Sequence, residues 1–249
     1  MRPAFGAAVG LASTESVPLP SQGMSSYGQF CPVSKAAEVV CERWTPLIVR
    51  ELLAGSSRFN EIKRGLPTCS PAMLSKRLRE LEAAGVVTRA ADDGSVSYQL
   101  TAAGWELFPL IQGLGEWGQR WARSRYADDE LDPGVLMWDV RRYLAPGLAE
   151  RRVVLLFRFP STALKRRSYW VLVEPDAVDI CLTDPGIDID VTVTADLRAL
   201  TKVWMGDVTF RGAVRDGVIA LEGPSTLTRR IPDWFGQHPI LGPVGEMVG

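Results

Sequence analysis

Between Arg58 and Thr101 the chain reads, in order, as a short helix, a turn, a capped helix, a glycine and a hairpin, and this ordered set constrains the fold more than any other feature. The capped helix has leucines at the spacing of a single buried helical face: Leu74, Leu78 and Leu81. Ser70 and Pro71 predict where it begins, because serine caps a helix N-terminus well and proline suits the first turn. Gly85 predicts where it ends, since glycine commonly follows the last helical residue. The order is that of a winged helix-turn-helix.

Two β-rich runs follow this helix, Val86–Ala90 and Val96–Leu100, joined by Asp92-Asp93-Gly94-Ser95. An Asp-Gly pair between such runs is the strongest short-range signal for a hairpin, which would be the wing. A helical bundle also shows leucines at this spacing, and a basic helix face is often exposed to solvent without any binding role. The ordered set of elements nevertheless favours DNA binding. The candidate DNA contacts are small, polar or basic residues of the outer helix face and of the wing: Ser70, Ala72, Ser75, Lys76, Arg79, Arg89 and Ser95.

The charge distribution separates the front of the chain from the back. The formal net charge of the 249 residues is −1. Residues 29–126 hold 13 basic and 10 acidic side chains, a net of +3, whereas residues 127–249 hold 14 basic and 18 acidic, a net of −4. A basic front half suits phosphate contacts, which supply much of the affinity for DNA. Because DNA would repel the acidic back half, we expect that half to have another role.

Two further helices with surplus apolar faces are predicted beside the DNA-reading unit. One runs from Thr101 to about Tyr126 and the other from Val33 to Trp44. Their apolar positions recur at steps of three and four: Leu107, Leu110, Leu114, Trp117 and Trp121 in the later helix, and Val33, Ala37, Val40 and Trp44 in the earlier one. Readers of DNA half-sites usually dimerise, so that two recognition helices reach major grooves about 34 Å apart. The apolar faces therefore predict a homodimer.

At this point the residues resemble the HxlR family of bacterial transcriptional regulators. Separate landmarks carry the resemblance over about Phe30 to Trp121: Cys31-Pro32, Trp44–Ile48, Arg58–Ile62, Leu74–Glu82 and Tyr98–Gly104. The resemblance implies a homodimeric winged helix-turn-helix with dimer contacts from its first and last helices. It also implies that Cys31 senses oxidants or electrophiles, as the cysteine at this position does in some members.

The four cysteines are scattered and suit reduced thiols in a cytoplasmic protein: Cys31, Cys41, Cys69 and Cys181. Cys69 is expected to be buried, and Cys41 is expected on or near the apolar side of the first helix. Cys31 lies at a helix N-terminus, whose partial positive charge lowers a thiol pKa. Inert packing and a redox role both remain open for Cys31.

The added part after about residue 131 reads as α+β. Helices are expected over Asp132–Leu144, Ala195–Met205 and Pro224–Trp234. Strands are expected over Val153–Phe159, Tyr169–Val173, Val178–Leu182, Ile187–Val193, Phe210–Val214 and Val218–Leu221. The alternation of apolar and polar residues from Ile187 to Thr194 is typical of a half-buried strand.

Residues from about Tyr169 to Phe235 resemble the sterol-carrier-protein type-two-like fold, through the run from Asp190 to Phe235. The resemblance implies an apolar tunnel between a sheet and helices that accepts an acyl chain or another lipid-like molecule. The candidate walls are large apolar residues of the sheet and the later helices: Trp170, Val193, Leu200, Trp204, Phe210, Leu221, Leu227 and Trp234. Ordinary core packing is the alternative interpretation of the same side chains.

No catalytic or metal-binding pattern is present, so we expect no enzyme activity, no metal and no cofactor. His238 is the single histidine, and CxxC, HExxH, GxGxxG, P-loop and GxSxG patterns are missing. Asp188 and Asp190 share one face of an expected strand, where solvated charges are the better interpretation. No apolar run approaches the roughly 20 residues that cross a bilayer.

These observations predict an α+β protein of two domains, with a winged helix-turn-helix for DNA binding and dimerisation over 27–126 and a sterol-carrier-like ligand-binding domain over 131–249. A disordered tail is expected over 1–26, with Met24 as an alternative start. The prediction is a cytoplasmic bacterial repressor that an apolar small molecule controls. One alternative is a thiol sensor that uses Cys31 beside a purely structural C-terminal domain. Another is a lipid carrier whose winged helix does not bind DNA.

Overall fold

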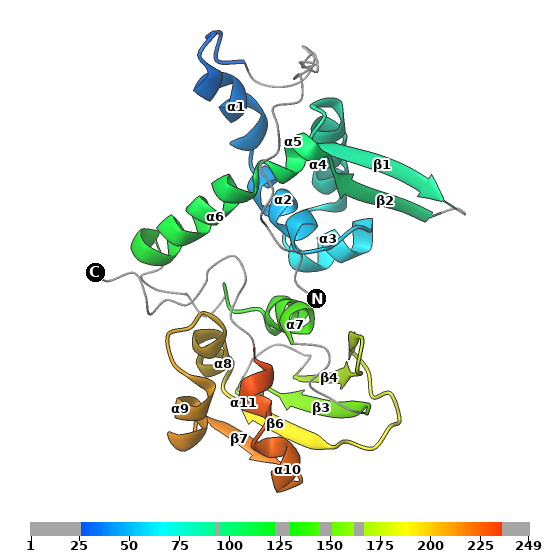
Figure 1. Ribbon diagram of the computed structural model, residues 1–249, viewed down its shortest axis with the longest axis vertical. Coiled ribbons are helices and arrows are strands. Elements are labelled where there is room, and N and C mark those ends of the chain that lie inside the picture. The colour runs from blue at the N-terminus through cyan, green and yellow to red at the C-terminus, as the bar shows by residue number, and fades with distance from the viewer. Residues whose placement is uncertain (1–25, 93–94, 123–129, 145–150, 162–166, 236–249) are drawn as a thin grey trace, which may run out of the picture.

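The computed structural model describes residues 26–92, 95–122, 130–144, 151–161 and 167–235 (Figure 1). The N-terminal part contains, in order, α1 (Pro32–Val40), α2 (Thr45–Leu53), α3 (Phe59–Gly65), α4 (Pro71–Ala83), β1 (Val87–Asp92), β2 (Ser95–Leu100), α5 (Ala102–Trp105), α6 (Phe108–Trp117) and the π-helical turn η1 (Gly118–Ala122). The expected tail up to residue 25, the Asp93-Gly94 pair, the stretch 123–129 and His238 lie outside the described residues.

The helices and the hairpin enclose one hydrophobic core, hereafter the N-terminal core. Its buried members come from α2, α3, α4, α6 and the hairpin, and include Ile48, Ile62, Leu74, Leu78, Leu81 and Ile111. Gly85 takes a left-handed φ of 69°, which turns the chain from α4 into the wing. Thr101 then caps α5 by accepting from the Gly104 N–H at 3.1 Å. The expected helix, turn, capped helix and hairpin are confirmed in this order.

Two helices are shorter than predicted. The helix expected from Thr101 to Tyr126 is broken, because α5 ends at Trp105 and α6 begins at Phe108. Pro109 lies in the first turn of α6, where its missing N–H costs nothing, but it does not fit the interior of one continuous helix. The helix expected through Trp44 ends at Val40, and Trp44 adopts a left-handed φ of 78° immediately before α2.

The C-terminal part contains α7 (Pro133–Tyr143), β3 (Val153–Arg158), β4 (Ser168–Val173), β5 (Val178–Cys181), β6 (Val191–Ala195), α8 (Leu197–Trp204), α9 (Phe210–Arg215), β7 (Ile219–Glu222), α10 (Ser225–Thr228) and α11 (Ile231–Trp234). The strands form a five-stranded sheet in the order β5-β4-β3-β6-β7. Strands β3 and β6 are parallel, and the other neighbouring pairs are antiparallel. Asp132 starts α7 as predicted, by accepting from the Gly134 N–H at 2.7 Å.

Alternate side chains of this sheet point to one face and build a second core, hereafter the C-terminal core. Phe157 of β3 lies in register with Tyr169 of β4 and with Val193 of β6. Helices α7, α8, α9 and α11 contribute buried residues to the same cluster, among them Met137, Leu200, Phe210 and Trp234. The α+β content expected for this part of the chain is confirmed.

Three expected elements of this part are wrong. The strand predicted from Ile187 starts only at Val191, because Asp190 turns the chain onto β3: its N–H donates to the Val154 carbonyl at 3.0 Å, and its carboxylate accepts from the Val154 N–H at 2.8 Å. Phe210–Val214 is helical rather than a strand, since Phe210 and Ala213 bury one helical face. The last helix is divided into α10 and α11.

Helix α7 lies between the two cores (Figure 1). One side of it packs on the sheet through Leu136, Met137 and Val140. The other side contacts α3 of the N-terminal part. Gly65, the last residue of α3, lets α3 lie close to Glu51 of α2, because a Cβ there would collide with the Glu51 carboxylate, which in turn pairs with Arg142 of α7. The helix is therefore shared structurally by both parts of the chain.

Candidate nucleic-acid interface and its connection to the C-terminal core

Helix α4 presents a small and basic face to solvent. Ser70 caps it by accepting from the Met73 N–H at 3.2 Å, so the chain enters the helix as the sequence predicted. Residues Ala72, Lys76 and Arg79 are exposed and Ser75 is half-buried, while the leucines face the core. Ser70 is exposed as well. The side chains proposed to meet DNA therefore lie along one accessible side of the helix.

Arg77 holds α4 in place from its buried side. Its Nε donates to the Arg43 carbonyl at 3.0 Å, and its two terminal nitrogens lie 2.6 Å from the carboxylates of Glu42 and Glu80. Sequence reasoning missed this role. The spacing of Arg77 and Glu80 was a visible signal, but Glu42 is 35 residues away and no local pattern relates the two.

The wing is hydrogen-bonded to the residues just before α3. Tyr98 of β2 donates its N–H to the Ser57 carbonyl at 2.7 Å, and Arg58 forms a β-bridge with Ser97. Arg89 of β1 and Ser95 of β2 are exposed at the hairpin. Among the described residues, Arg79 and Arg89 have no acidic partner, whereas Lys76 lies 3.7 Å from Glu80. Exposed cations without a partner suit phosphate contacts.

Many large apolar side chains of the N-terminal part remain exposed, and together they are called the exposed apolar surface. Its members come from the chain before α1, from α1 itself and from α5 to η1: Phe30, Val33, Trp105, Phe108, Leu110, Leu114, Trp117 and Trp121. The exposed fractions of Trp117 and Trp121 are 60% and 69%. Leu107, Val40 and Trp44 of the predicted dimer stripes instead pack inward. Patches of large apolar side chains usually mark contact surfaces.

The cysteines lie in different environments. Cys69 is buried as predicted, and burial raises the pKa of its thiol. Cys41 is exposed at the end of α1, so the expectation that it lies on the apolar side is wrong. Cys31 precedes α1, and the backbone N–H groups of Ser34 and Val33 hold the pKa of the Cys31 thiol below its usual value.

Of the eight residues proposed as ligand walls, seven lie in or against the C-terminal core: Val193, Leu200, Trp204, Phe210, Leu221, Leu227 and Trp234. Trp170 is the exception. It lies opposite Leu156 in the register of β3 and β4, and the inward residues of β4 are its neighbours Tyr169 and Val171. Trp170 therefore points to the other face of the sheet, because successive side chains alternate along a strand.

A buried ionic cluster joins α2 to α7. The Glu51 carboxylate is fully buried, and it pairs with Arg50 at 2.8 Å and with Arg142 of α7. Arg142 also donates to the Ser56 hydroxyl at 2.6 Å and lies 3.5 Å from Asp139. Burial raises the pKa of Asp139 to about 6. The positive charges of Arg50 and Arg142 lower this pKa, and the negative charge of Glu51 raises it further. Burial likewise raises the pKa of Tyr143 to about 12.

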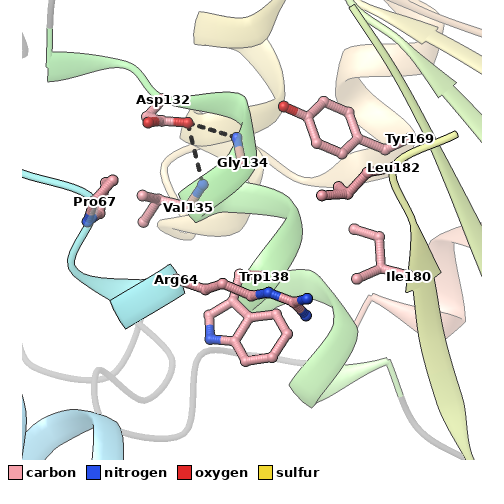
Figure 2. Close-up of a pocket in the computed structure, with 9 residues that line it drawn as sticks. All are labelled: Arg64, Pro67, Asp132, Gly134, Val135, Trp138, Tyr169, Ile180 and Leu182. Carbon is pink, nitrogen blue, oxygen red and sulfur yellow. Dashed lines mark hydrogen bonds between the residues drawn. The ribbon is translucent and has the colours of Figure 1, made fainter. Parts of the chain in front are cut away.

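Beside this cluster, arginines surround the indole of Trp138. The guanidinium carbons of Arg64, Arg141 and Arg142 lie 5.2, 4.8 and 5.0 Å from its ring centroid. A pocket of about 260 Å³ opens at this place, and Figure 2 shows its lining: Arg64, Pro67, Asp132, Gly134, Val135, Trp138, Tyr169, Ile180 and Leu182. None of the eight predicted wall residues lines it.

In the part of the chain that the structure describes, no group of three or more His, Cys, Asp or Glu side chains is placed to hold a metal ion. Across those same residues, no helix combines the length and the apolar character that crossing a membrane requires.

The similarity of this chain to known proteins lies in its N-terminal part, and the matches described below each cover about two fifths of the chain or less. The sequence pattern described as HxlR-like helix-turn-helix matches residues 39–126. The uncharacterized HTH-type transcriptional regulator YvaP of Bacillus subtilis (strain 168) is 38% identical over 104 residues, which are 40% of this chain and 96% of that protein. The uncharacterized HTH-type transcriptional regulator Rv3095 of Mycobacterium tuberculosis (strain ATCC 25618 / H37Rv) is 41% identical over 92 residues, 36% of this chain and 58% of that protein. Among solved structures, the reduced form of the transcriptional regulator YodB from B. subtilis is 31% identical and matches 39% of this chain and 100% of that chain, with a TM-score of 0.35.

The raised pKa of Asp139 gives a prediction for the pH dependence of stability. The folded protein binds this proton more tightly than the unfolded chain, whose ordinary pKa is 3.8. The resulting stabilisation is complete below about pH 4 and is lost as the pH rises through about 6. We therefore expect the unfolding free energy of Asp139→Asn, relative to the wild type, to rise by about 1–3 kcal/mol between about pH 4 and pH 7.

Urea unfolding of both proteins across this range measures the effect. Asp190→Asn is the matched control, because hydrogen bonds from Arg151 and the Val154 N–H outweigh partial burial and hold the pKa of Asp190 below its usual value. The difference in unfolding free energy between Asp190→Asn and the wild type should change below about pH 4 and be constant above it. The same pH dependence in Asp139→Asn and the wild type would contradict the assignment.

Proposed function

The chain belongs to the HxlR-like helix-turn-helix family, and from this premise we propose that it is a homodimeric, cytoplasmic transcriptional repressor whose affinity for double-stranded DNA is set by a small apolar molecule bound to its C-terminal region. The exposed face of α4 is the observation that carries the DNA-binding part of this proposal. It offers cations and small residues on a helix that is capped at one end and held by Arg77 from behind. A rigid helix with a narrow outer face suits the major groove.

The proposed contacts divide by role. Ser70, Ala72, Ser75, Lys76 and Arg79 enter the groove with α4, and Arg79 is the candidate for reading a guanine, since arginine pairs with two acceptors of that base. Arg89 and Ser95 of the wing contact phosphates and fix the orientation of the protein on the duplex. Arg79 is available for this role because it has no acidic partner among the described residues.

A double variant tests the recognition face. We expect Lys76→Ala/Arg79→Ala to weaken binding to the DNA upstream of its own gene, with the Arg79 change alone costing about 1–3 kcal/mol. Arg89→Ala should weaken binding to all sequences alike, because phosphate contacts carry no base information. Fluorescence anisotropy with specific and unrelated duplexes measures both effects. Arg211→Ala, an exposed arginine of α9 paired with Asp233 at 2.7 Å, is the control. Unchanged affinity of the double variant would exclude α4 as the recognition helix.

The exposed apolar surface supports the proposed homodimer. It joins the beginning of α1 to α6 and η1, the regions whose stripes predicted dimerisation, and burying it against a second copy removes several aromatic rings from water. Such an isologous contact uses the same patch on both copies. It also places two copies of α4 on one assembly, as a reader of two half-sites requires.

Trp117→Asp tests this assembly. A charge in the centre of the contact has no partner, so the variant should be monomeric or aggregated while the wild type is dimeric. Light scattering at about micromolar protein measures the mass. Val218→Asp, at an exposed position outside this surface, is the matched control and should stay dimeric. A wild-type mass of one chain would contradict the proposal.

The C-terminal region is proposed to be sterol-carrier-like and to hold the effector. The five-stranded sheet covered by helices supports this, and so does the gathering of seven predicted wall residues on its inner face. An effector changes DNA affinity only if it binds two states of the protein differently. The contact of α7 with α2 and α3 gives the C-terminal region a direct connection to the DNA-reading helices.

A thiol switch at Cys31 is the second candidate, and the lowered pKa of this thiol is the observation that favours it. A thiolate reacts with oxidants and electrophiles faster than a thiol. If it is the switch, diamide should release DNA from the wild type but not from Cys31→Ser. Cys41→Ser, which alters the exposed thiol just after α1, should behave as the wild type. Retention of DNA by oxidised wild type excludes this candidate. A chain that binds lipid but no DNA would instead favour the carrier alternative.

A further inference from the structure

The pocket between the two cores is built from both parts of the chain. Arg64 belongs to α3, and Pro67 lies in the turn that leads from α3 to the recognition helix. The remaining lining comes from the first half of α7 and from β4, β5 and the residue after it. Figure 2 shows Arg64 extending along the Trp138 ring toward the side where Ile180 and Leu182 lie. A molecule in this pocket touches the DNA-reading part and the sheet at once.

Arg64 brings a positive charge without a salt-bridge partner to this pocket, whose lining also includes the carboxylate of Asp132. Its guanidinium lies 5.2 Å from the Trp138 ring centroid, and no acidic partner for it occurs among the described residues. The two other arginines at the same ring are already engaged. Arg142 pairs with Glu51, and Arg141 lies 3.5 Å from Asp179. Arg64 is therefore the cation left to meet a ligand.

The backbone N–H groups at the beginning of α7 are not available to bind an anion in this pocket. Asp132 accepts from the Gly134 N–H at 2.7 Å and from the Val135 N–H at 3.3 Å, so these donors are already used. The other side chains at the pocket are mostly apolar or aromatic: Pro67, Val135, Trp138, Tyr169, Ile180 and Leu182. One free guanidinium above an apolar and aromatic wall is the arrangement that a compact organic anion requires.

We propose that this pocket binds a small aromatic monocarboxylate, with its carboxylate on Arg64 and its ring against Trp138, Val135 and Leu182. Its volume of about 260 Å³ suits a molecule of one or two rings, since the pockets that hold drug-sized ligands measure about 300–1,000 Å³. The site rests on the proposed function only for its regulatory role. In that role the effector is an aromatic anion held between the two cores, and not an apolar molecule inside the C-terminal core.

The position of the pocket gives binding a route to DNA affinity. Arg64 is the penultimate residue of α3, and Ser70, the cap of α4, follows the pocket residue Pro67 by three positions. A carboxylate held between Arg64 and the C-terminal lining changes the separation of α3 from α7. Because α4 follows α3 through this short turn, the orientation of the recognition helix changes with it.

Isothermal titration calorimetry tests the site with benzoate, salicylate and indole-3-acetate, each beside its neutral amide. The wild type should bind at least one acid with a Kd below about 1 mM and its amide about tenfold more weakly. Arg64→Gln should weaken that acid about tenfold and leave the amide unchanged. Arg43→Gln is the matched control, because Arg43 is an exposed arginine 5.3 Å from the Trp44 ring and lies outside the pocket. Leu182→Glu, at a position 38% exposed, should repel the acid without threatening the fold.

Binding of none of the acids, or equal binding by wild type and Arg64→Gln, overturns the site. So does a loss in Arg43→Gln as large as in Arg64→Gln. Operator binding without any acid is measured separately by anisotropy, so that failure of the regulator proposal is distinguishable. If the apo chain binds DNA and the acids do not bind, the pocket is wrong and the regulator stands. If the acids bind through Arg64 and the chain does not bind DNA, the site stands and the regulator proposal is wrong.

Discussion

The ion pair between Glu51 and Arg142 is the contact on which the arrangement of the whole chain depends. Glu51 belongs to a helix of the N-terminal core and is fully buried, and Arg142 belongs to the helix that covers the C-terminal sheet. Removing two charges from water is expensive, so such a pair adds little net stability. Breaking it is costly, however, because one buried charge is left without a partner. The pair therefore selects one relative position of the two cores rather than simply strengthening their contact.

A chain of specific contacts leads from this pair to α4, whose exposed face is the candidate DNA-binding surface. Gly65 ends α3 against the Glu51 carboxylate, and α3 continues through a short turn into α4. Arg77 ties α4 back to the segment between α1 and α2, next to the helix that carries Glu51. Helix α4, the candidate recognition helix, is thus held by the polar contacts of Arg77 at its buried face, while Arg79 on its outer face has no acidic partner among the described residues. The contacts of α7 therefore reach α4 through the residues that support it and not through the side chains proposed to contact DNA.

Local patterns predicted the elements whose ends are marked by caps and periodic apolar residues. Ser70 with the leucines of α4, Asp132 before α7 and Gly85 before the wing are of this kind, because each signal lies within a few residues of its effect. Predictions of secondary structure failed where contacts with residues distant in the sequence determined the local conformation. Asp190 turns onto Val154, which no alternation of apolar residues reveals. The apolar residues of Phe210–Val214 fit either a strand or a helix over so short a run, and the burial of Phe210 together with Ala213 against the core selects the helix.

The candidate site shows the same division. The outer residues of α4 could be chosen from sequence because a single helix fixes which residues share a face. The partners of Arg77, the Glu51–Arg142 pair and the pocket at Trp138 could not, since each joins residues from separate elements. The outward direction of Trp170 depends on strand register, which apolar character alone does not determine.

Hydrogen–deuterium exchange with and without operator DNA tests most directly whether α7 connects the two parts of the chain. Coupling between two sites is reciprocal, so DNA bound at α4 must alter the helix through which an effector would act. Amide exchange should slow in peptides of α4 and also in those of α7, which lies against α3 and the sheet. In Arg142→Met the change at α7 should disappear while that at α4 remains. Protection of α4 with unaltered exchange throughout α7 in the wild type would contradict the account.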